Sequence, residues 1–104
     1  MRRGEIWWAE VSPHSERRPV LLLSRNEAYI ARSLVIVAPI TTRIRHIPSE
    51  VLLGTDDGMP RECAVNLESV TSIPKVSLRE HLVTLSSEKM ADIEKAIQFA
   101  LGLK

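Results

Sequence analysis

The residues from Leu34 to Thr41 read Leu-Val-Ile-Val-Ala-Pro-Ile-Thr and are apolar at almost every position. A strand with one face in water alternates apolar and polar residues, whereas a continuous apolar run is typical of a strand buried on both faces. We therefore expect this segment to be a central strand of a sheet. Proline lacks a backbone N–H, so Pro39 indicates a bulge or a free edge near the end of the strand.

Shorter segments rich in strand-forming residues precede and follow this run, with turn signals between many of them. The expected strands are Glu5–Val11, Pro19–Ser24, Glu50–Leu53, Glu62–Leu67, Ser69–Ile73 and a weaker one at His81–Leu85. Residues 25–32 are expected to form a short helix or helical loop, and residues 54–60 a turn.

The end of the chain changes to a helical period. Apolar residues recur there at spacings of three and four, at Met90, Ile93, Ile97, Ala100 and Leu101. Ser86 is a good N-cap, Glu88 suits the first turn and Gly102 is placed to end the helix. Short strands followed by one amphipathic helix predict a mainly β (α+β) fold, a twisted antiparallel sheet or small barrel. A length of 104 residues fits a single domain over residues 1–104.

Charge is distributed unevenly along the chain. The net charge of +1 by itself predicts no partner, yet residues 17–45 contain six arginines and one acid, Glu27. The planar guanidinium group forms paired hydrogen bonds with phosphate. The run predicts a phosphate-binding face, although arginines that only solvate the surface of a small barrel would give the same pattern.

The cysteine and histidine content limits the chemistry. One cysteine, Cys63, excludes an internal disulfide framework and fits a reducing compartment. No apolar run approaches the ~18 residues that a membrane span needs, so we expect a cytoplasmic protein with no membrane partner. The histidines His14, His46 and His81 are isolated, and the phosphate-cradling glycine loops are absent, so we expect no metal ion and no cofactor. A Cys–His nucleophile pair stays open, although Cys63 in an apolar strand favours a core position.

Two polar segments stand out beside the expected strands. The first is His14-Ser15-Glu16-Arg17-Arg18-Pro19, in which the proline restricts the backbone of Arg18. The second is Thr41-Thr42-Arg43-Ile44-Arg45, directly after the central strand. In a sheet, the end of one strand can lie beside the start of its neighbour, so the two segments predict an anion site. Alternatively, they are a charged hairpin loop and a threonine-rich strand end.

At these segments the chain resembles the MazF/PemK family of toxin endoribonucleases from toxin–antitoxin systems. The resemblance runs along nearly the whole chain in five pieces that occur in the family's order. They are Arg3–Glu10, Arg18–Ser24, Val37–Thr42, Pro60–Val70 and the last helix with Leu85–Met90 and Ala100–Leu103.

The resemblance implies a small SH3-like, partly open antiparallel barrel of the CcdB/MazF plasmid-toxin type, with a short helix and a C-terminal amphipathic helix. It also implies a homodimer and a cognate MazE-like antitoxin that binds through an acidic or disordered tail. The implied activity is metal-independent, sequence-specific cleavage of single-stranded RNA. In this reaction the ribose 2′-hydroxyl attacks the adjacent phosphate, leaving a 2′,3′-cyclic phosphate or 3′-phosphate and a 5′-hydroxyl.

The resemblance also assigns residues. Arg18 and Thr41 fall on catalytic positions, and Glu16 falls less securely on the acid of a family loop that is shorter here and lacks its glycines. The general base is expected to be Glu16 or His14. The residues expected to bind RNA are His14, Ser15, Arg17, Arg25, Thr42, Arg43 and Arg45.

Two other functions remain open at this stage. A gyrase poison of the same fold, like CcdB, relies on a Trp-Gly-Ile ending, whereas this sequence ends in Gly-Leu-Lys. A non-enzymatic module would bind RNA or an acidic peptide on the arginine face without turnover.

Overall fold

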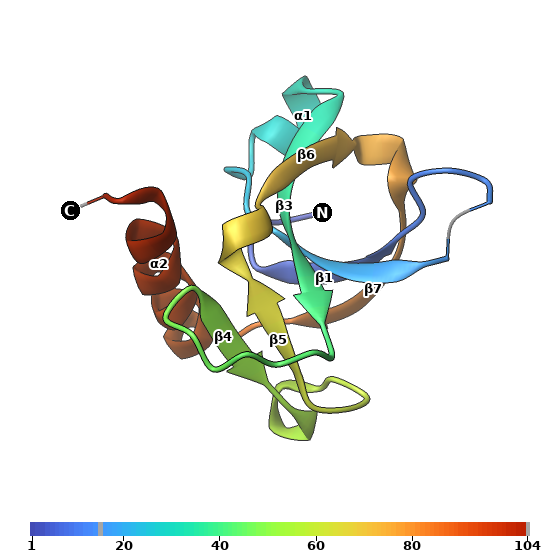
Figure 1. The fold of residues 1–104 in the computed structure, drawn as a ribbon. Coiled ribbons are helices and arrows are strands. Elements are labelled where there is room, and N and C mark those ends of the chain that lie inside the picture. The colour runs from blue at the N-terminus through green and yellow to red at the C-terminus, as the bar shows by residue number, and fades with distance from the viewer. Residues whose placement is uncertain (15, 104) are drawn as a thin grey trace.

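Figure 1 shows a computed structural model of the protein, which describes residues 1–14 and 16–103. The strands are β1 Glu5–Ala9, β2 Arg18–Leu22, β3 Leu34–Thr41, β4 Glu50–Leu53, β5 Cys63–Asn66, β6 Thr71–Pro74 and β7 Leu78–Thr84. The helices are α1 Ala28–Ala31 and α2 Ser87–Leu101, with single 3-10 turns at Thr55–Asp57, Leu67–Ser69 and Lys75–Ser77. No helix in the described part of the chain has the length and apolarity needed to cross a membrane.

The strands form one antiparallel sheet in the order β4-β5-β3-β2-β1-β7, with β6 also paired to β3. Strand β3 is central and pairs with three strands. Its first half pairs with β6, its middle with β2 and its last two residues with β5. The sheet curves round into a small barrel, and the Lys75–Ser77 turn leads from β6 into β7 (Figure 1). These features confirm the predicted antiparallel sheet with one C-terminal helix, and the predicted central position of Leu34–Thr41.

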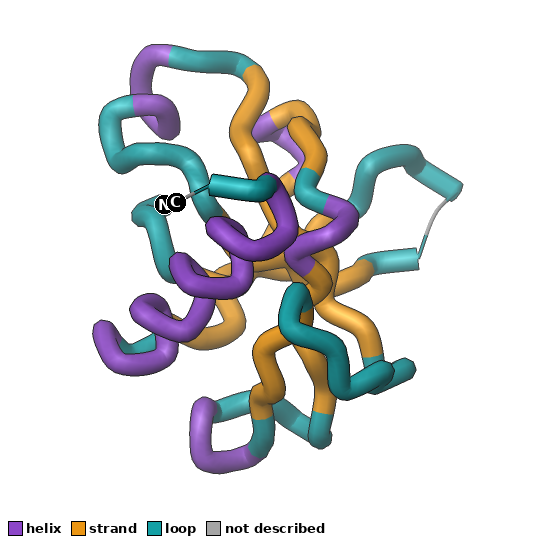
Figure 2. Tube along the Cα trace, turned by 60° about the vertical axis from the view of Figure 1, so that its left-hand side comes forward, coloured by secondary structure: helices purple, strands orange, loops and turns teal. Residues whose placement is uncertain are grey.

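The second half of β3 is buried on both faces, as its composition predicts, but Leu34 and Ile36 near its start are 54% and 45% exposed. Val35 and Val37 pack into a cluster inside the barrel together with Val20 and Leu22 of β2. Ala38 and Ile40 point to the other face and join the larger core, which also contains residues of β4, β5 and α2. Helix α2 covers this outer face (Figure 2), with Ile93 and Ala96 buried against the strands.

The ends of α2 follow the expected capping pattern. The Ser86 hydroxyl accepts a hydrogen bond from the backbone N–H of Lys89 at 3.1 Å. Gly102 ends the helix in the left-handed conformation with φ of 68°, which glycine adopts at little cost. Leu101 was expected on the apolar face but is 59% exposed. It lies about 80° round the helix from Ile93, whereas Ala100 lies within about 20°.

Candidate active site

The register between β2 and β3 brings the two predicted catalytic side chains to one edge of the sheet. Val20 lies opposite Pro39, and the pairing runs on through Leu21 and Leu22. Continued by two residues toward the start of β2, the same register places Arg18 opposite Thr41. Arg18 also lies opposite Ala9 at the end of β1. Residues far apart in the sequence therefore meet because β2 begins where β3 ends.

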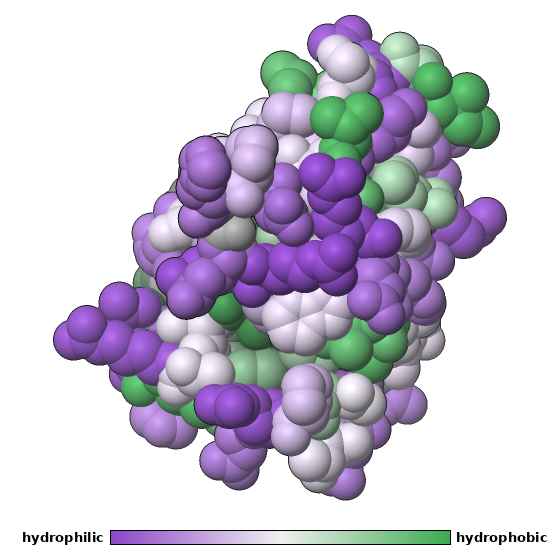
Figure 3. All heavy atoms as spheres, turned by 90° about the vertical axis from the view of Figure 1, so that its right-hand side faces the viewer, coloured by the Kyte–Doolittle hydropathy of each residue, from purple (hydrophilic) through white to green (hydrophobic). Residues whose placement is uncertain are grey.

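This edge opens into a cleft of about 630 Å³. Its walls come from the end of β1, the start of β2, the end of β3 with the following loop, and the turn that precedes β5. The lining residues are Trp8, Glu16, Arg17, Arg18, Pro19, Pro39, Ile40, Thr41, Thr42, Arg45, Met59, Pro60, Arg61, Cys63 and Asn66. Figure 3 views the side of the molecule that carries the β1–β2 loop, where hydrophilic side chains surround a hollow with apolar atoms at its base.

The cleft is positively charged. Among its described lining residues are four guanidinium groups, from Arg17, Arg18, Arg45 and Arg61, and one carboxylate, from Glu16. Arginine remains charged in proteins, so this excess does not depend on pH near neutrality. Such a surface attracts polyanions and lines up several donors for phosphate oxygens.

Arg18 faces solvent at the mouth of the cleft. Its side chain is 78% exposed, and its Nη2 lies 4.0 Å from Oε2 of Glu16. A contact of this length between two exposed groups contributes little to stability. The guanidinium can therefore turn toward a ligand without breaking a strong interaction.

Arg17 is held differently from Arg18. Its Nε lies 3.4 Å from Oε2 of Glu10, and its Nη1 lies 3.6 Å from Oε1 of Glu80. These carboxylates, at the end of β1 and in β7, offset the charge of Arg17 and tie the β1–β2 loop to the sheet. We therefore expect Arg17 to contribute less to anion binding than Arg18.

Thr41 ends β3 and is half-buried. Its Oγ1 accepts the backbone N–H of Arg43 at 3.0 Å, which starts the turn after the strand. Because this bond uses a lone pair of the oxygen, the hydroxyl hydrogen can still be donated to a ligand in the cleft. Thr41 therefore presents a neutral donor on the same edge as Arg18.

A second wall comes from the turn before β5. Thr41 pairs with Ala64 of β5, so Pro60 and Arg61 lie beside the end of β3. Gly58 permits this turn, because its φ is 90° and a Cβ there would lie 2.8 Å from Cγ1 of Val83. Arg61, Trp8 and Asn66 line the cleft but were not predicted to belong to the site. They reach it through the pairing of β5 with β3 and of β1 with β2, for which the sequence carries no local signal.

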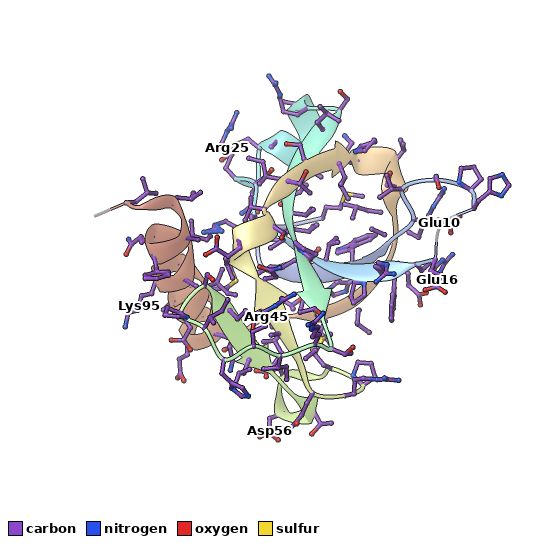
Figure 4. The ribbon with its side chains drawn as sticks, in the orientation of Figure 1. Glu10, Glu16, Arg25, Arg45, Asp56 and Lys95 are labelled. Atoms are coloured by element: carbon purple, nitrogen blue, oxygen red, sulfur yellow. The ribbon has the colours of Figure 1, made fainter. Side chains whose placement is uncertain are left out.

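Some residues expected to bind RNA do not line the cleft. His14 is exposed in the β1–β2 loop, and Arg43 is exposed with its backbone turned toward Thr41. Arg25 lies beside α1, well away from Glu16 and Arg45 (Figure 4). Ser15 lies outside the described residues. The cleft thus brings together Glu16, Arg17, Arg18, Thr41, Thr42 and Arg45.

Cys63 also lines the cleft, but its thiol is poorly suited to act as a nucleophile. The residue is 3% exposed and belongs to the core beneath the cleft. Burial, and then the nearby Asp57, raise the pKa of the Cys63 thiol. A protonated thiol is a poor nucleophile, so the burial and the raised pKa of Cys63 do not favour a Cys–His pair, although His46 lines a neighbouring pocket with it. No cluster of three or more His, Cys, Asp or Glu side chains suited to a metal ion occurs in residues 1–14 and 16–103.

Comparison with known proteins gives a consistent set of matches. The family model for PemK-like, MazF-like toxins of type II toxin–antitoxin systems matches residues 2–101. A Mycobacterium tuberculosis protein described as "Probable endoribonuclease MazF5" is 42% identical over 100 residues, which cover 95% of this chain and 91% of that protein.

Solved structures share the fold. The Mycobacterium tuberculosis toxin MazF-mt6 superposes with a TM-score of 0.87 at 28% identity, covering 96% of this chain and 98% of that one. A mycobacterial endoribonuclease in complex with its cognate antitoxin gives a TM-score of 0.87 at 26% identity, covering 100% and 97% of the two chains.

Proposed function

The chain belongs to the PemK-like, MazF-like toxin family of type II toxin–antitoxin systems, and from that premise we propose that its arginine-lined cleft cleaves single-stranded RNA at short sequences without a metal ion. It is a MazF-like endoribonuclease toxin. The observation that supports the cleft as the active site is the shared edge of β2 and β3, where Arg18 and Thr41 line one cavity.

The reaction we propose is an internal transesterification. The ribose 2′-oxygen forms a bond to the adjacent phosphorus, and the bond from phosphorus to the 5′-oxygen of the next nucleotide breaks. The 2′-hydroxyl proton passes to a base, and the departing 5′-oxygen takes up a proton. The products are a 2′,3′-cyclic phosphate, which can open to a 3′-phosphate, and a 5′-hydroxyl.

Arg18 and Thr41 stabilise the charge that this attack creates. Negative charge builds on the non-bridging oxygens of the phosphate, and fixed donors aimed at such charge are usually the largest catalytic contribution. Arg18 supplies two parallel N–H donors and a positive charge. Thr41 adds a neutral O–H donor from the neighbouring strand.

Glu16 is the base that the geometry favours. It lines the cleft and approaches the guanidinium of Arg18, whereas His14 lies in the same loop but outside the cleft lining. A positioned base contributes roughly 10²–10⁴-fold to such a step. His14 remains the second candidate for this role, because imidazole titrates close to neutral pH.

Partners follow from the same surface. We propose that an acidic antitoxin tail occupies the cleft, because carboxylates bind the arginines that otherwise bind phosphate. A mycobacterial relative with the same fold has been solved with its cognate antitoxin. We propose further that the protein acts in the cytoplasm as a homodimer. The comparisons do not favour the gyrase-poison alternative.

The proposed function is tested by incubating the purified protein with total RNA and sequencing the new 5′-hydroxyl ends. We expect cuts at one short recurring sequence, both with and without EDTA. An oligonucleotide carrying that sequence with 2′-deoxyribose at the scissile position should stay intact, because it lacks the nucleophile. Cleavage of the deoxy oligonucleotide, or activity that EDTA abolishes and added divalent ion restores, would contradict the mechanism. Binding without any cleavage would favour the non-enzymatic module.

A further inference from the structure

Glu50 is a buried acid that no part of the proposed mechanism uses. It is the first residue of β4, and its side chain is 0% exposed. Buried carboxylates are rare unless they are paired, so the partners of this group indicate why it is there.

Both oxygens of Glu50 are directed at a single residue, Arg45. Oε1 accepts the backbone N–H of Arg45 at 2.8 Å, and Oε2 lies 3.4 Å from its Nη1. Glu50 and Lys89 both line a groove against α2, but Lys89 pairs with Asp57 at 3.7 Å. The carboxylate therefore fixes both the backbone and the guanidinium of Arg45.

Because Glu50 restricts Arg45, it also restricts one of the guanidinium groups that line the cleft. Its side chain is 47% exposed and lines the cavity that also contains Arg18 and Thr41. The segment between β3 and β4 has no regular structure over residues 42–49. Without Glu50, an arginine in such a loop would sample many rotamers and lose entropy on binding.

Stability alone does not account for this arrangement. A buried ion pair contributes little net stability, because removing two charges from water offsets their attraction. The hydrogen bond from the Arg45 backbone N–H accounts for one oxygen of Glu50, but not for the contact of the other oxygen with the guanidinium. Glu50 is a buried anion that holds the backbone and guanidinium of Arg45, which is half-exposed in the cleft. This arrangement is better explained by the need to fix Arg45 before a ligand binds.

We propose that Glu50 is a positioning residue that holds Arg45 as a preorganised contact for an RNA phosphate next to the scissile one. The inference rests on the proposed function, since it names a further subsite of the same cleft. Arg18, Thr41 and Arg45 line the same cleft, so the two arginines can contact successive phosphates of one strand. Glu50 itself touches no substrate and acts through Arg45.

The test compares Glu50→Gln, Arg45→Ala and the double variant. Each variant is titrated with a single-stranded oligonucleotide that carries the mapped cleavage sequence and 2′-deoxyribose at the scissile position. We expect each single variant to weaken binding about tenfold, and Arg45→Ala to reduce the slope of log affinity against log salt by about 0.7, the contribution of one phosphate contact on a single strand. The double variant should bind within about twofold of Arg45→Ala, because Glu50 acts on the ligand only through Arg45, whose backbone and guanidinium it holds.

Kinetic measurements and control variants distinguish a positioning role of Glu50 from a general loss of structure. Against the cleavable oligonucleotide, Glu50→Gln should raise KM with kcat changed less than threefold, because the contact is not at the reacting phosphorus. Glu94→Gln, an exposed acid on α2, and Arg32→Ala, an exposed arginine beside α1, should both behave like the wild type. If Glu50→Gln does not fold, Glu50→Asp retains the charge and is expected to give a smaller rise in KM.

The outcomes distinguish this inference from the proposed function. A wild type that neither binds nor cleaves RNA would overturn both. A wild type that cleaves RNA, combined with single-variant effects that multiply in the double variant, would overturn the role of Glu50 alone. So would a folded Glu50→Gln protein with unchanged affinity and KM.

Discussion

Replacing Arg18 with alanine is the perturbation that separates catalysis from folding most cleanly. The side chain is 78% exposed and its contact with Glu16 is 4.0 Å long. The substitution therefore removes no buried contact, and we expect the free energy of unfolding to change by no more than about 0.5 kcal/mol. Any large effect on cleavage must then come from the guanidinium itself.

The expected size follows from the role of the donor. Removing one donor that is aimed at developing charge costs about 2.7–4 kcal/mol, or roughly 10²–10³ in rate. Solvent screens an exposed charge, which favours the lower end of this range. We therefore expect Arg18→Ala to lower the single-turnover rate about 10²-fold. Arg18→Lys keeps the charge but not the paired donors, so we expect a loss of about tenfold.

The assay is single-turnover cleavage of a fluorescent oligonucleotide that carries the mapped sequence, with thermal melts run in parallel. Arg32→Ala is the matched control, because it removes an exposed arginine beside α1 that does not line the cleft. A folded Arg18→Ala protein that cleaves within about threefold of the wild-type rate would refute the reasoning.

Three further predictions follow from the site and the core. Thr41→Val removes the neutral donor and should lower cleavage about tenfold in the same assay, since one hydrogen bond to a charged group contributes about 1.5 kcal/mol; an unchanged rate would remove Thr41 from the mechanism. RNA affinity should fall with salt with a log–log slope of about −2 to −3, because four cleft arginines each displace about 0.7 counterion from a single strand, and a flat response would contradict the arginine-lined cleft. Burial raises the pKa of Tyr29 to about 12, and its hydroxyl donates a hydrogen bond to the Ser24 carbonyl at 3.1 Å. Because the folded pKa is the higher one, the stability that Tyr29 contributes is complete below about pH 10 and is lost as pH rises toward 12. Urea unfolding should show that Tyr29→Phe is about 1 kcal/mol less stable at pH 7 and that this difference shrinks at pH 11; a variant with the same alkaline loss as the wild type would assign that loss to another group.

The parts of the fold that sequence predicts well are those with a strong local signal. Leu34–Thr41 is apolar throughout and forms β3 with those bounds. The helical period and the Ser86 cap place α2 at 87–101. In both segments, local preference and tertiary packing favour the same structure.

The incorrect predictions concern where strands begin, at places where one side-chain hydrogen bond or a distant partner strand sets the boundary. The strand expected at Ser69–Ile73 begins only at Thr71, because the Asn66 side chain accepts the N–H of Glu68 and turns Leu67–Ser69 into a 3-10 turn. Strand β7 begins at Leu78, earlier than expected, because it pairs with the whole of β1. No periodicity within residues 78–80 indicates that pairing.

The residues of the site likewise divide into those that a local sequence signal predicts and those that depend on pairing between distant strands. Arg18 and Thr41 were predicted to lie close together, because each flanks a clear strand. Arg61 and Trp8 enter the cleft only through the register of β5 with β3 and of β1 with β2. Register depends on contacts between distant segments, which a single sequence does not show.

The most direct test of the central claim is a crystal structure of the protein with the uncleavable 2′-deoxy oligonucleotide bound. We expect the Arg18 guanidinium and the Thr41 hydroxyl both to lie about 3 Å from non-bridging oxygens of the same phosphate, the one that follows the deoxyribose. A strand bound outside the cleft, or one whose scissile phosphate contacts neither side chain, would contradict the account.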